Sequence, residues 1–245
     1  IIEIIKEDKW GLLVNIVIDL VREAIKLGRG KIAILVDEAF HLIGYEKSAL
    51  YVKALLGVIE YPPASYEKII AVVATSEGLS REEIGRHLWA EIRPMWNMSE
   101  KGFKELYKQI PGDKPSYEDI WRVTGGNPRV LGMLYNARWS TEEVVRRLII
   151  EKKLNEFISG LAENERRLLR EALDDPDVLM SREGIPLMKK LVKANLIVDE
   201  IPERDHGLWI DTPPPERDTD LGIGRYVAWQ TPLHKEAVRR VLMRL

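Results

Sequence analysis

Two adjacent acidic residues, Asp37 and Glu38, directly follow the apolar run Ile32 to Val36. An aspartate in such a place can hold Mg²⁺, directly or through water, and a neighbouring glutamate can orient or deprotonate an attacking water molecule. Adjacent side chains at a strand edge diverge, so the two acids can serve different tasks. The simpler alternative is that they cap a strand and begin a helix. The pair is therefore the first candidate for metal and water chemistry.

A second polar pair, Thr75 and Ser76, follows the apolar segment Lys68 to Ala74. If this segment is a strand beside the first one, a hydroxyl at its end could sense a terminal phosphate or position a water molecule. Taken alone, such hydroxyls are more often helix caps. Both readings stay open on this pattern alone.

The segments around these residues predict an α/β arrangement. Apolar residues recur every three or four positions over residues 8–27, which indicates an amphipathic helix that ends at Gly28. Residues 32–36 and 68–74 are typical of strands buried on both faces of a parallel sheet, and residues 47–60 of a helix between them. In such a sheet, ligands bind at the carboxyl edge, where both polar pairs fall. Two short strands do not make a stable sheet, so we expect at least one partner strand outside this chain.

From about residue 80 the pattern becomes helical. Capping residues predict helices that start near Ser80, Ser99, Ser116 and Thr141. Residues 124–134, TGGNPRVLGML, break this pattern, because two glycines stop one helix and the proline suits the first turn of the next. This part of the chain therefore predicts a small helical domain.

The last third of the chain has the pattern of a winged helix. Helices are expected first, followed by a short strand at 196–198, a long hairpin from the β-like segments 207–211 and 224–230, and a final helix at 233–245. The loop between the hairpin segments is rich in proline and acidic residues, so we expect it to be mobile.

Taken in order, KIAILVDEAFHLIG, IIAVVATSEGLSR, TGGNPRVLGMLY and a terminal winged helix resemble the archaeal ATPase family of P-loop NTPases of the AAA+/STAND type. That group is related to the archaeal replication initiators and the NB-ARC ATPases. The resemblance implies ATP and Mg²⁺ as cofactors, with Asp37 and Glu38 as the Walker B acids. It further implies that Thr75 and Ser76 form the sensor 1 position.

In the helical part, the resemblance assigns Gly125, Gly126 and Pro128 to the family's glycine–proline motif near the nucleotide's base and sugar. Arg129 follows where a phosphate-contacting sensor 2 arginine could be placed, although a solvated arginine in a first helical turn is an equal alternative. The implied domains are the C-terminal part of an α/β nucleotide-binding domain (1–79), a helical lid (80–160) and a winged helix (161–245).

One family motif is missing from these residues. The phosphate loop G-x-x-x-x-G-K-[ST] does not occur, because GRGKI at 28–32 has Ile32 in place of the hydroxyl residue and precedes a strand instead of following one. The chain begins with Ile1 and not with methionine. We therefore expect the phosphate loop upstream of Ile1; without it, this protein would have no NTPase activity.

Arginines and lysines offer two further candidate sites. Arg81 and Arg86 could act as arginine fingers towards a neighbouring subunit in an oligomer, although exposed arginines are usually just solvated. Lys189, Lys190 and Lys193 lie on the candidate recognition helix of the winged helix, and Arg225 on its wing.

The charge balance of the last third of the chain argues against a surface that binds DNA strongly. Residues 163–245 contain 14 Lys and Arg against 16 Asp and Glu, whereas a phosphate-tracking surface is usually richer in positive charge. Contact with a protein partner is therefore at least as well supported as contact with DNA.

Composition excludes several other classes. The chain has 245 residues, of which 45% are hydrophobic and 31% charged, a net charge of −2 and no cysteine. Disulfides and thiolate metal sites are excluded, and no apolar run is long enough for a membrane span. This composition fits a cytoplasmic protein, and the many charged residues are also typical of thermophiles. The four histidines, His41, His87, His206 and His234, show no metal-ligand spacing.

The function expected from the sequence is a nucleotide switch. ATP and Mg²⁺ would bridge sheet and lid, and hydrolysis by a water aligned at Glu38 would release the lid and move the winged helix. Two alternatives remain: a winged-helix DNA-binding protein with a vestigial nucleotide site, and a scaffold for protein contacts.

Overall fold

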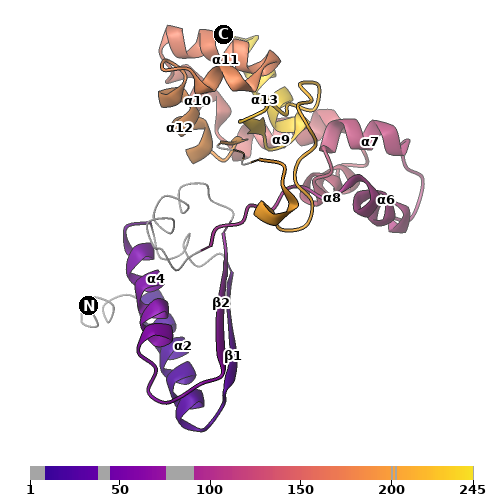
Figure 1. The fold of residues 1–245 in the computed structure, drawn as a ribbon. Helices are drawn as coiled ribbons and strands as arrows, with labels where there is room; N and C mark the ends of the chain where they lie inside the picture. Colours follow the sequence, from indigo (N-terminus) through magenta and orange to yellow (C-terminus); the bar gives the residue numbers. More distant parts are fainter. Residues whose placement is uncertain (1–8, 38–44, 76–90, 200, 202, 245) are drawn as a thin grey trace. The chain divides into compact units, whose positions relative to one another are not determined.

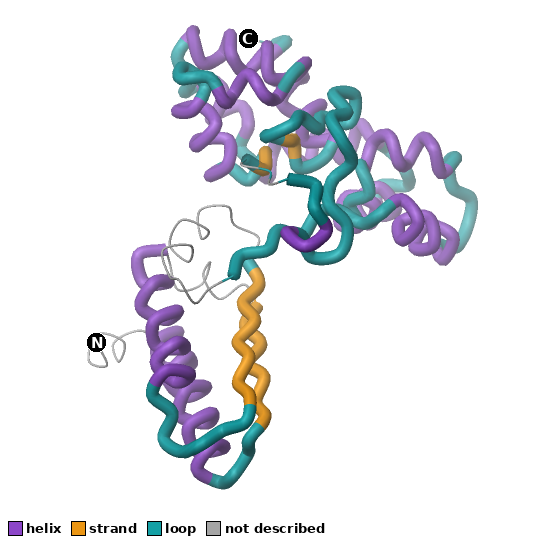
Figure 2. Tube along the Cα trace, viewed as in Figure 1, coloured by secondary structure: helices purple, strands orange, loops and turns teal. Residues whose placement is uncertain are grey.

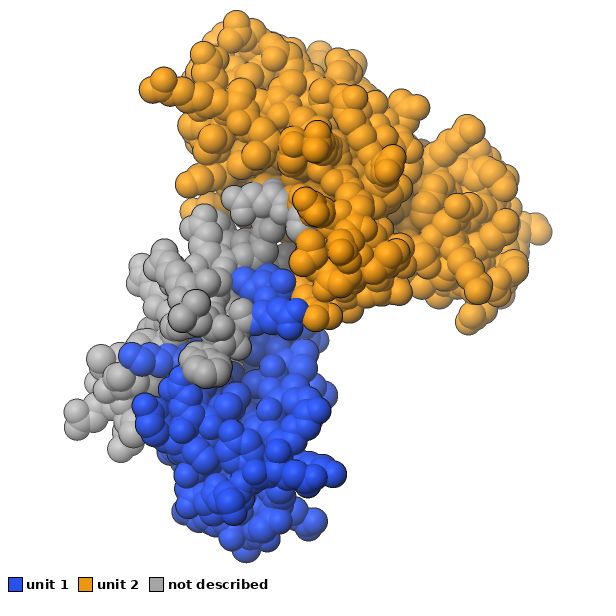
Figure 3. Space-filling model, in the orientation of Figure 1, with its two compact units in different colours: residues 1–92 blue, residues 93–245 orange. Residues whose placement is uncertain are grey.

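The structure is a computed structural model that describes residues 9–37, 45–75, 91–199, 201 and 203–244. Figures 1 and 2 show a mixed α/β chain with a small parallel sheet and many helices. The chain forms two compact units, residues 1–92 and 93–245, which are coloured separately in Figure 3. Each unit is described by itself.

Unit 1 contains the predicted helices and strands: α2 (Lys9–Lys26), β1 (Lys31–Asp37), α4 (Tyr45–Glu60) and β2 (Lys68–Ala74). The prediction of parallel strands is confirmed, because β1 and β2 pair in parallel from Lys31 opposite Lys68 to Asp37 opposite Ala74. Gly28 lies just after α2 with a φ of 80°, the left-handed conformation that lets the chain turn into β1.

The helices of unit 1 cover one face of the sheet (Figure 2). Its core contains Ile18, Val21 and Ile25 of α2, Ile34 of β1, and Leu55 and Val58 of α4. The opposite face is open: Leu35 is 78% exposed and Val72 is 49% exposed. The expectation that both strands are buried on both faces is therefore wrong within the described residues, since exposure alternates along each strand.

Unit 2 consists mainly of helices, and its elements are, in chain order, α6 (Glu100–Gln109), α7 (Tyr117–Thr124), α8 (Pro128–Asn136), α9 (Thr141–Glu151), α10 (Leu154–Ser159), α11 (Glu163–Asp174), η1 (Pro176–Met180), α12 (Ile185–Lys193), β3 (Ile197–Val198), η2 (His206–Leu208), β4 (Ala228–Trp229) and α13 (Pro232–Leu242).

Side-chain caps explain several helix starts. Ser99 caps α6 and Ser116 caps α7, as predicted. Ser80 lies outside the described residues.

One hydrophobic core extends through unit 2, from Phe103 of α6 to Leu242 of α13. Helix α13 packs against α9, and its Arg240 forms an ion pair with Glu142 at 2.6 Å. Residues of the predicted lid and of the predicted winged helix thus share a core. The division of the chain at residues 79/80 and 160/161 stays a prediction.

The C-terminal hairpin differs from its prediction. Strand β4 pairs antiparallel with β3, Ile197 opposite Trp229, and covers only residues 228–229 of the expected segment 224–230. Residues 206–208 form the short helix η2, because the Asp205 carboxylate accepts a hydrogen bond from the Gly207 N–H at 2.7 Å. Ile210 then bridges to Met95. The long hairpin expected between 207–211 and 224–230 is therefore wrong.

Asp177 holds the segment before β4. Its carboxylate accepts hydrogen bonds from three consecutive backbone N–H groups, those of Arg225, Tyr226 and Val227, at 2.7, 2.8 and 3.2 Å. A Cβ on Gly224 would lie 2.5 Å from the same carboxylate, so the close approach requires glycine. One side chain thus binds the three residues that precede β4.

The described part of the chain contains no helix with both the length and the apolar character needed to cross a membrane.

Asp177→Ala should lower the free energy of unfolding of unit 2 by about 2 kcal/mol, because three backbone donors lose their acceptor. Urea denaturation followed by tryptophan fluorescence measures this change. The matched control is Asp113→Ala, at an exposed aspartate, which should change stability by less than about 0.5 kcal/mol. Equal losses in the two variants would contradict the role given to Asp177.

Candidate functional site

Asp37 and Thr75 lie at the same edge of the unit 1 sheet. Asp37 is the last residue of β1 and pairs with Ala74, the last residue of β2, so Thr75 follows at the same level. Neighbouring strands are about 4.8 Å apart, which brings the two residues into one site. The Asp37 side chain is exposed, and within the described part of the chain its carboxylate has no hydrogen bond or ion pair.

This edge suits a Mg²⁺ ion that is bound together with a phosphate. The described residues contain no group of three or more His, Cys, Asp or Glu side chains that could hold a metal by themselves. Mg²⁺ is usually held by one or two carboxylates, with waters and phosphate oxygens completing its octahedron. The free carboxylate of Asp37 fits that role, whereas it could not form an all-protein metal cage.

Four predicted site residues lie outside the described residues: Glu38, Ser76, Arg81 and Arg86. Their roles as catalytic acid, sensor hydroxyl and arginine fingers stay predictions.

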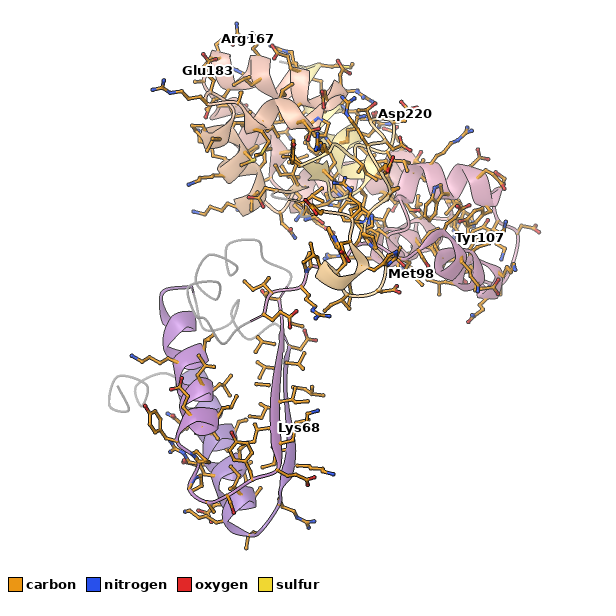
Figure 4. The ribbon with its side chains drawn as sticks, in the orientation of Figure 1. Lys68, Met98, Tyr107, Arg167, Glu183 and Asp220 are labelled. Atoms are coloured by element: carbon orange, nitrogen blue, oxygen red, sulfur yellow. The ribbon has the colours of Figure 1, made fainter. Side chains whose placement is uncertain are left out.

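The glycine–proline motif forms a tight turn between α7 and α8 in unit 2. Gly125 and Gly126 have φ values of 58° and 79°, and Pro128 is the first residue of α8, which Asn127 caps. A Cβ on Gly126 would lie 2.6 Å from the backbone oxygen of Met98, a residue labelled in Figure 4. The turn therefore requires its glycines for backbone conformation and packing, whatever it binds.

The same turn contacts the C-terminal part of unit 2. A Cβ on Gly125 would lie 3.0 Å from Cδ of Pro232, at the start of α13. The Asn127 amide donates to Oδ1 of Asn97 at 2.8 Å, and the Asn97 amide donates to the backbone oxygen of Gln230 at 3.3 Å. Movement of the turn would thus act directly on the segment between β4 and α13.

Three cationic or titratable groups gather near this turn: Arg129, Lys152 and His234. Burial, together with the positive charges of Lys152 and Arg129, lowers the pKa of His234 to about 4. Burial also lowers the pKa of Lys152, with Arg129 as the second cause. The nearby carboxylate of Glu151 only partly offsets this effect. The cluster has an excess of positive charge that a bound anion would relieve.

Sequence reasoning identified only Arg129 of this cluster. Lys152 lies at the end of α9 and His234 in the first turn of α13, so neither is near Arg129 in the sequence. The capping pattern Thr231-Pro232 predicts the helix start on which His234 lies, since the Thr231 hydroxyl caps α13 and contacts Nδ1 of His234 at 2.8 Å. No sequence signal brings Lys152 to that helix.

Some of the residues predicted to contact DNA already interact with other side chains. Lys189, Lys190 and Lys193 lie on α12 with exposed side chains, but Lys190 forms an ion pair with Glu165 at 2.7 Å. The guanidinium of Arg225 lies 5.1 Å from the centre of the Tyr226 ring. DNA binding through this face stays a prediction.

Gly126→Ala should destabilise unit 2 by about 2 to 4 kcal/mol, because the added Cβ meets a backbone oxygen and the residue keeps a positive φ. Gly132→Ala is the matched control: a Cβ at this position in α8 has no atom within 4 Å. It should stabilise the helix by about 0.5 to 1 kcal/mol. Chemical denaturation of both variants checks the opposite signs, and a neutral Gly126→Ala would contradict the packing described.

His234 should make stability depend on pH. Its pKa is about 4 in the folded protein and about 6.5 in the unfolded chain. Between these values the unfolded state binds more protons, so stability falls as the pH drops from 6.5 towards 4. From pH 7 to pH 5 the loss should be about 2 kcal/mol.

The measurement compares unfolding free energies at pH 7 and pH 5 for the wild type and His234→Gln, which should lose less stability on acidification. His206→Gln, at an exposed histidine of η2, is the control. If His234→Gln lost as much stability between pH 7 and pH 5 as the wild type, a group other than His234 would cause the loss.

Comparison with known families matches residues 2–134 to the ATPase domain predominantly from Archaea. Searches among curated proteins and among solved structures give no match. The matched region is more than half of the chain and includes Asp37, Thr75, the glycine–proline turn and Arg129. The chain belongs to the family of ATPase domains found predominantly in Archaea.

Proposed function

We propose that this chain is part of an ATP-dependent switch of the AAA+/STAND type, in which nucleotide state moves a C-terminal winged helix. The observation that carries the proposal is the parallel pairing of β1 and β2 up to Asp37 opposite Ala74. It brings a free carboxylate and the hydroxyl residue Thr75 to the carboxyl edge of the sheet, where α/β proteins bind ligands. Family membership supports the ATPase chemistry.

Each site residue has a separate role in this proposal. Asp37 would hold Mg²⁺, and Glu38 would orient the attacking water. Thr75 and Ser76 would sense the terminal phosphate. Bound Mg²⁺ supplies positive charge that neutralises the phosphate oxygens.

The route from nucleotide to winged helix would pass through the glycine–proline turn. Support comes from the contacts of Gly125 with Pro232 and of Asn127, through Asn97, with Gln230. These contacts join the start of α8 to the start of α13 within one unit, so a shift of the turn would also displace α13.

The cluster of Arg129, Lys152 and His234 would contact the phosphates when the switch is closed. The positive charge in the cluster supports this step: after burial, repulsion by neighbouring cations lowers the pKa of both Lys152 and His234, and a bound phosphate would relieve that repulsion. Loss of the terminal phosphate would restore that repulsion and favour the open state.

Glu38→Gln should keep ATP binding and slow hydrolysis by at least about 100-fold, since the glutamine cannot accept a proton from water. Binding of labelled ATP and release of phosphate measure the two effects. Asp37→Asn should weaken the Mg²⁺ dependence of both. The control is Glu60→Gln, at an exposed glutamate at the end of α4.

Unchanged hydrolysis in Glu38→Gln would remove Glu38 from the mechanism. Failure of the wild type to bind ATP would overturn the proposed switch.

A further inference from the structure

A cavity of about 380 Å³ lies in unit 2 where α7, α9 and α13 meet. Its lining comes from all three helices and from the loop that contains Asp220, a residue labelled in Figure 4. None of the three residues of the cluster around His234 lines it. The volume is within the range of small-molecule sites, which is about 300 to 1,000 Å³.

The lining combines an apolar surface with an excess of positive charge. The apolar part comes from Val123, Val145, Pro232 and Leu233. The charged part has four cations against two acids, Arg122, Lys235, Arg239 and Arg240 against Asp220 and Glu236. A lining that combines apolar side chains with placed charged groups suits a small organic ion.

Internal ion pairs account for only part of this charge. Glu236 accepts from Nη1 of Arg239 and from Nε of Arg240, each at 3.0 Å, so both of its oxygens are used. Arg240 also binds Glu142, at 2.6 Å, and is therefore compensated by two carboxylates. Arg239 pairs with Glu236, which also pairs with Arg240.

The side chains of the other two cations, Arg122 and Lys235, form no ion pair within the described residues. Within the part of the chain that the structure describes, the exposed guanidinium of Arg122 has no hydrogen bond or ion pair. The ammonium of Lys235, which is 7% exposed as a residue, donates to the backbone oxygen of Thr219 at 2.7 Å. Burial and the charge of Arg239 lower the pKa of Lys235, and the carboxylates of Asp174, Asp220 and Asp218 partly oppose this shift. A buried ammonium with three donors and one neutral acceptor leaves capacity for an anion.

We propose that this cavity binds a small molecule with two acid groups, carboxylates or phosphates, held by Arg122 of α7 and by Lys235 and Arg239 of α13. The ligand's carbon chain or bridging atoms would lie against the apolar lining. Arginine is the side chain best suited to this task, because its guanidinium binds a carboxylate or a phosphate through two parallel hydrogen bonds. Such a ligand would link α7 to α13 and hold them together.

The test is isothermal titration calorimetry of the whole chain with two probes, adipate and inorganic pyrophosphate, at low ionic strength. Adipate represents the dicarboxylates and pyrophosphate the phosphates, so the tighter probe identifies the acid group. Neither is a nucleotide, and the readout is binding, so the result does not depend on the proposed ATPase switch.

Arg122→Gln should weaken binding of the better probe by at least about 10-fold, since it removes a charged donor without breaking an internal contact. The control is Arg146→Gln, at an exposed arginine of α9 that does not line the cavity. It should bind as the wild type does. In the wild type, methyl signals of Val123 and Val145 should shift on titration, which locates the ligand without any substitution.

Two results would overturn the proposal. One is the absence of binding by both probes. The other is an equal loss of affinity in Arg122→Gln and Arg146→Gln, which would indicate general attraction of anions to surface charge.

Discussion

The turn at Gly125 and Gly126 is the constraint on which the arrangement of unit 2 depends. Both glycines have a positive φ, and side-chain atoms at either position would meet Met98, Trp121 or Pro232. Because no larger residue fits, α7, α8 and α13 approach one another more closely than side chains would normally allow. The turn is held further by Thr124, whose buried hydroxyl accepts a hydrogen bond from the Gly126 N–H at 3.4 Å.

Unit 1 depends on a different constraint, the parallel register of its two strands. Because Asp37 pairs with Ala74, a polar residue at the end of each strand reaches the same edge. A shift of one residue would turn Asp37 towards the helix-covered face, where Ile34 and its neighbours pack. The position of the candidate metal ligand is therefore set by the same apolar alternation that forms the core of this unit.

In the described part of unit 2, cations gather in the cluster around His234 and in the lining of the cavity beside Arg122. Both adjoin α13, which supplies His234 to the first and Lys235 and Arg239 to the second. Buried or clustered cations without partners reduce stability, so they are expected mainly where a ligand compensates them. The last helix of the chain thus connects the proposed nucleotide response with the proposed anion site.

Local sequence patterns determined most of the elements and the candidate acids. The three- and four-residue periodicity of α2, the apolar runs of β1 and β2, and the caps Ser99 and Ser116 act over a few residues, so they can be read without a fold. Asp37, Thr75 and the glycine–proline turn were identified in the same way. Local patterns cannot show whether a strand is covered on one face or two, as Leu35 and Val72 illustrate.

Only the tertiary structure decided the features that depend on residues far apart in the chain. Asp177 binds amides some fifty positions later, in a segment predicted to form a hairpin, and Lys152 acts on His234 from a different helix. The cavity beside Arg122 exists because α7, α9 and α13 converge. These features arise from long-range packing, whose partners are chosen by the fold as a whole and leave no local pattern in the sequence.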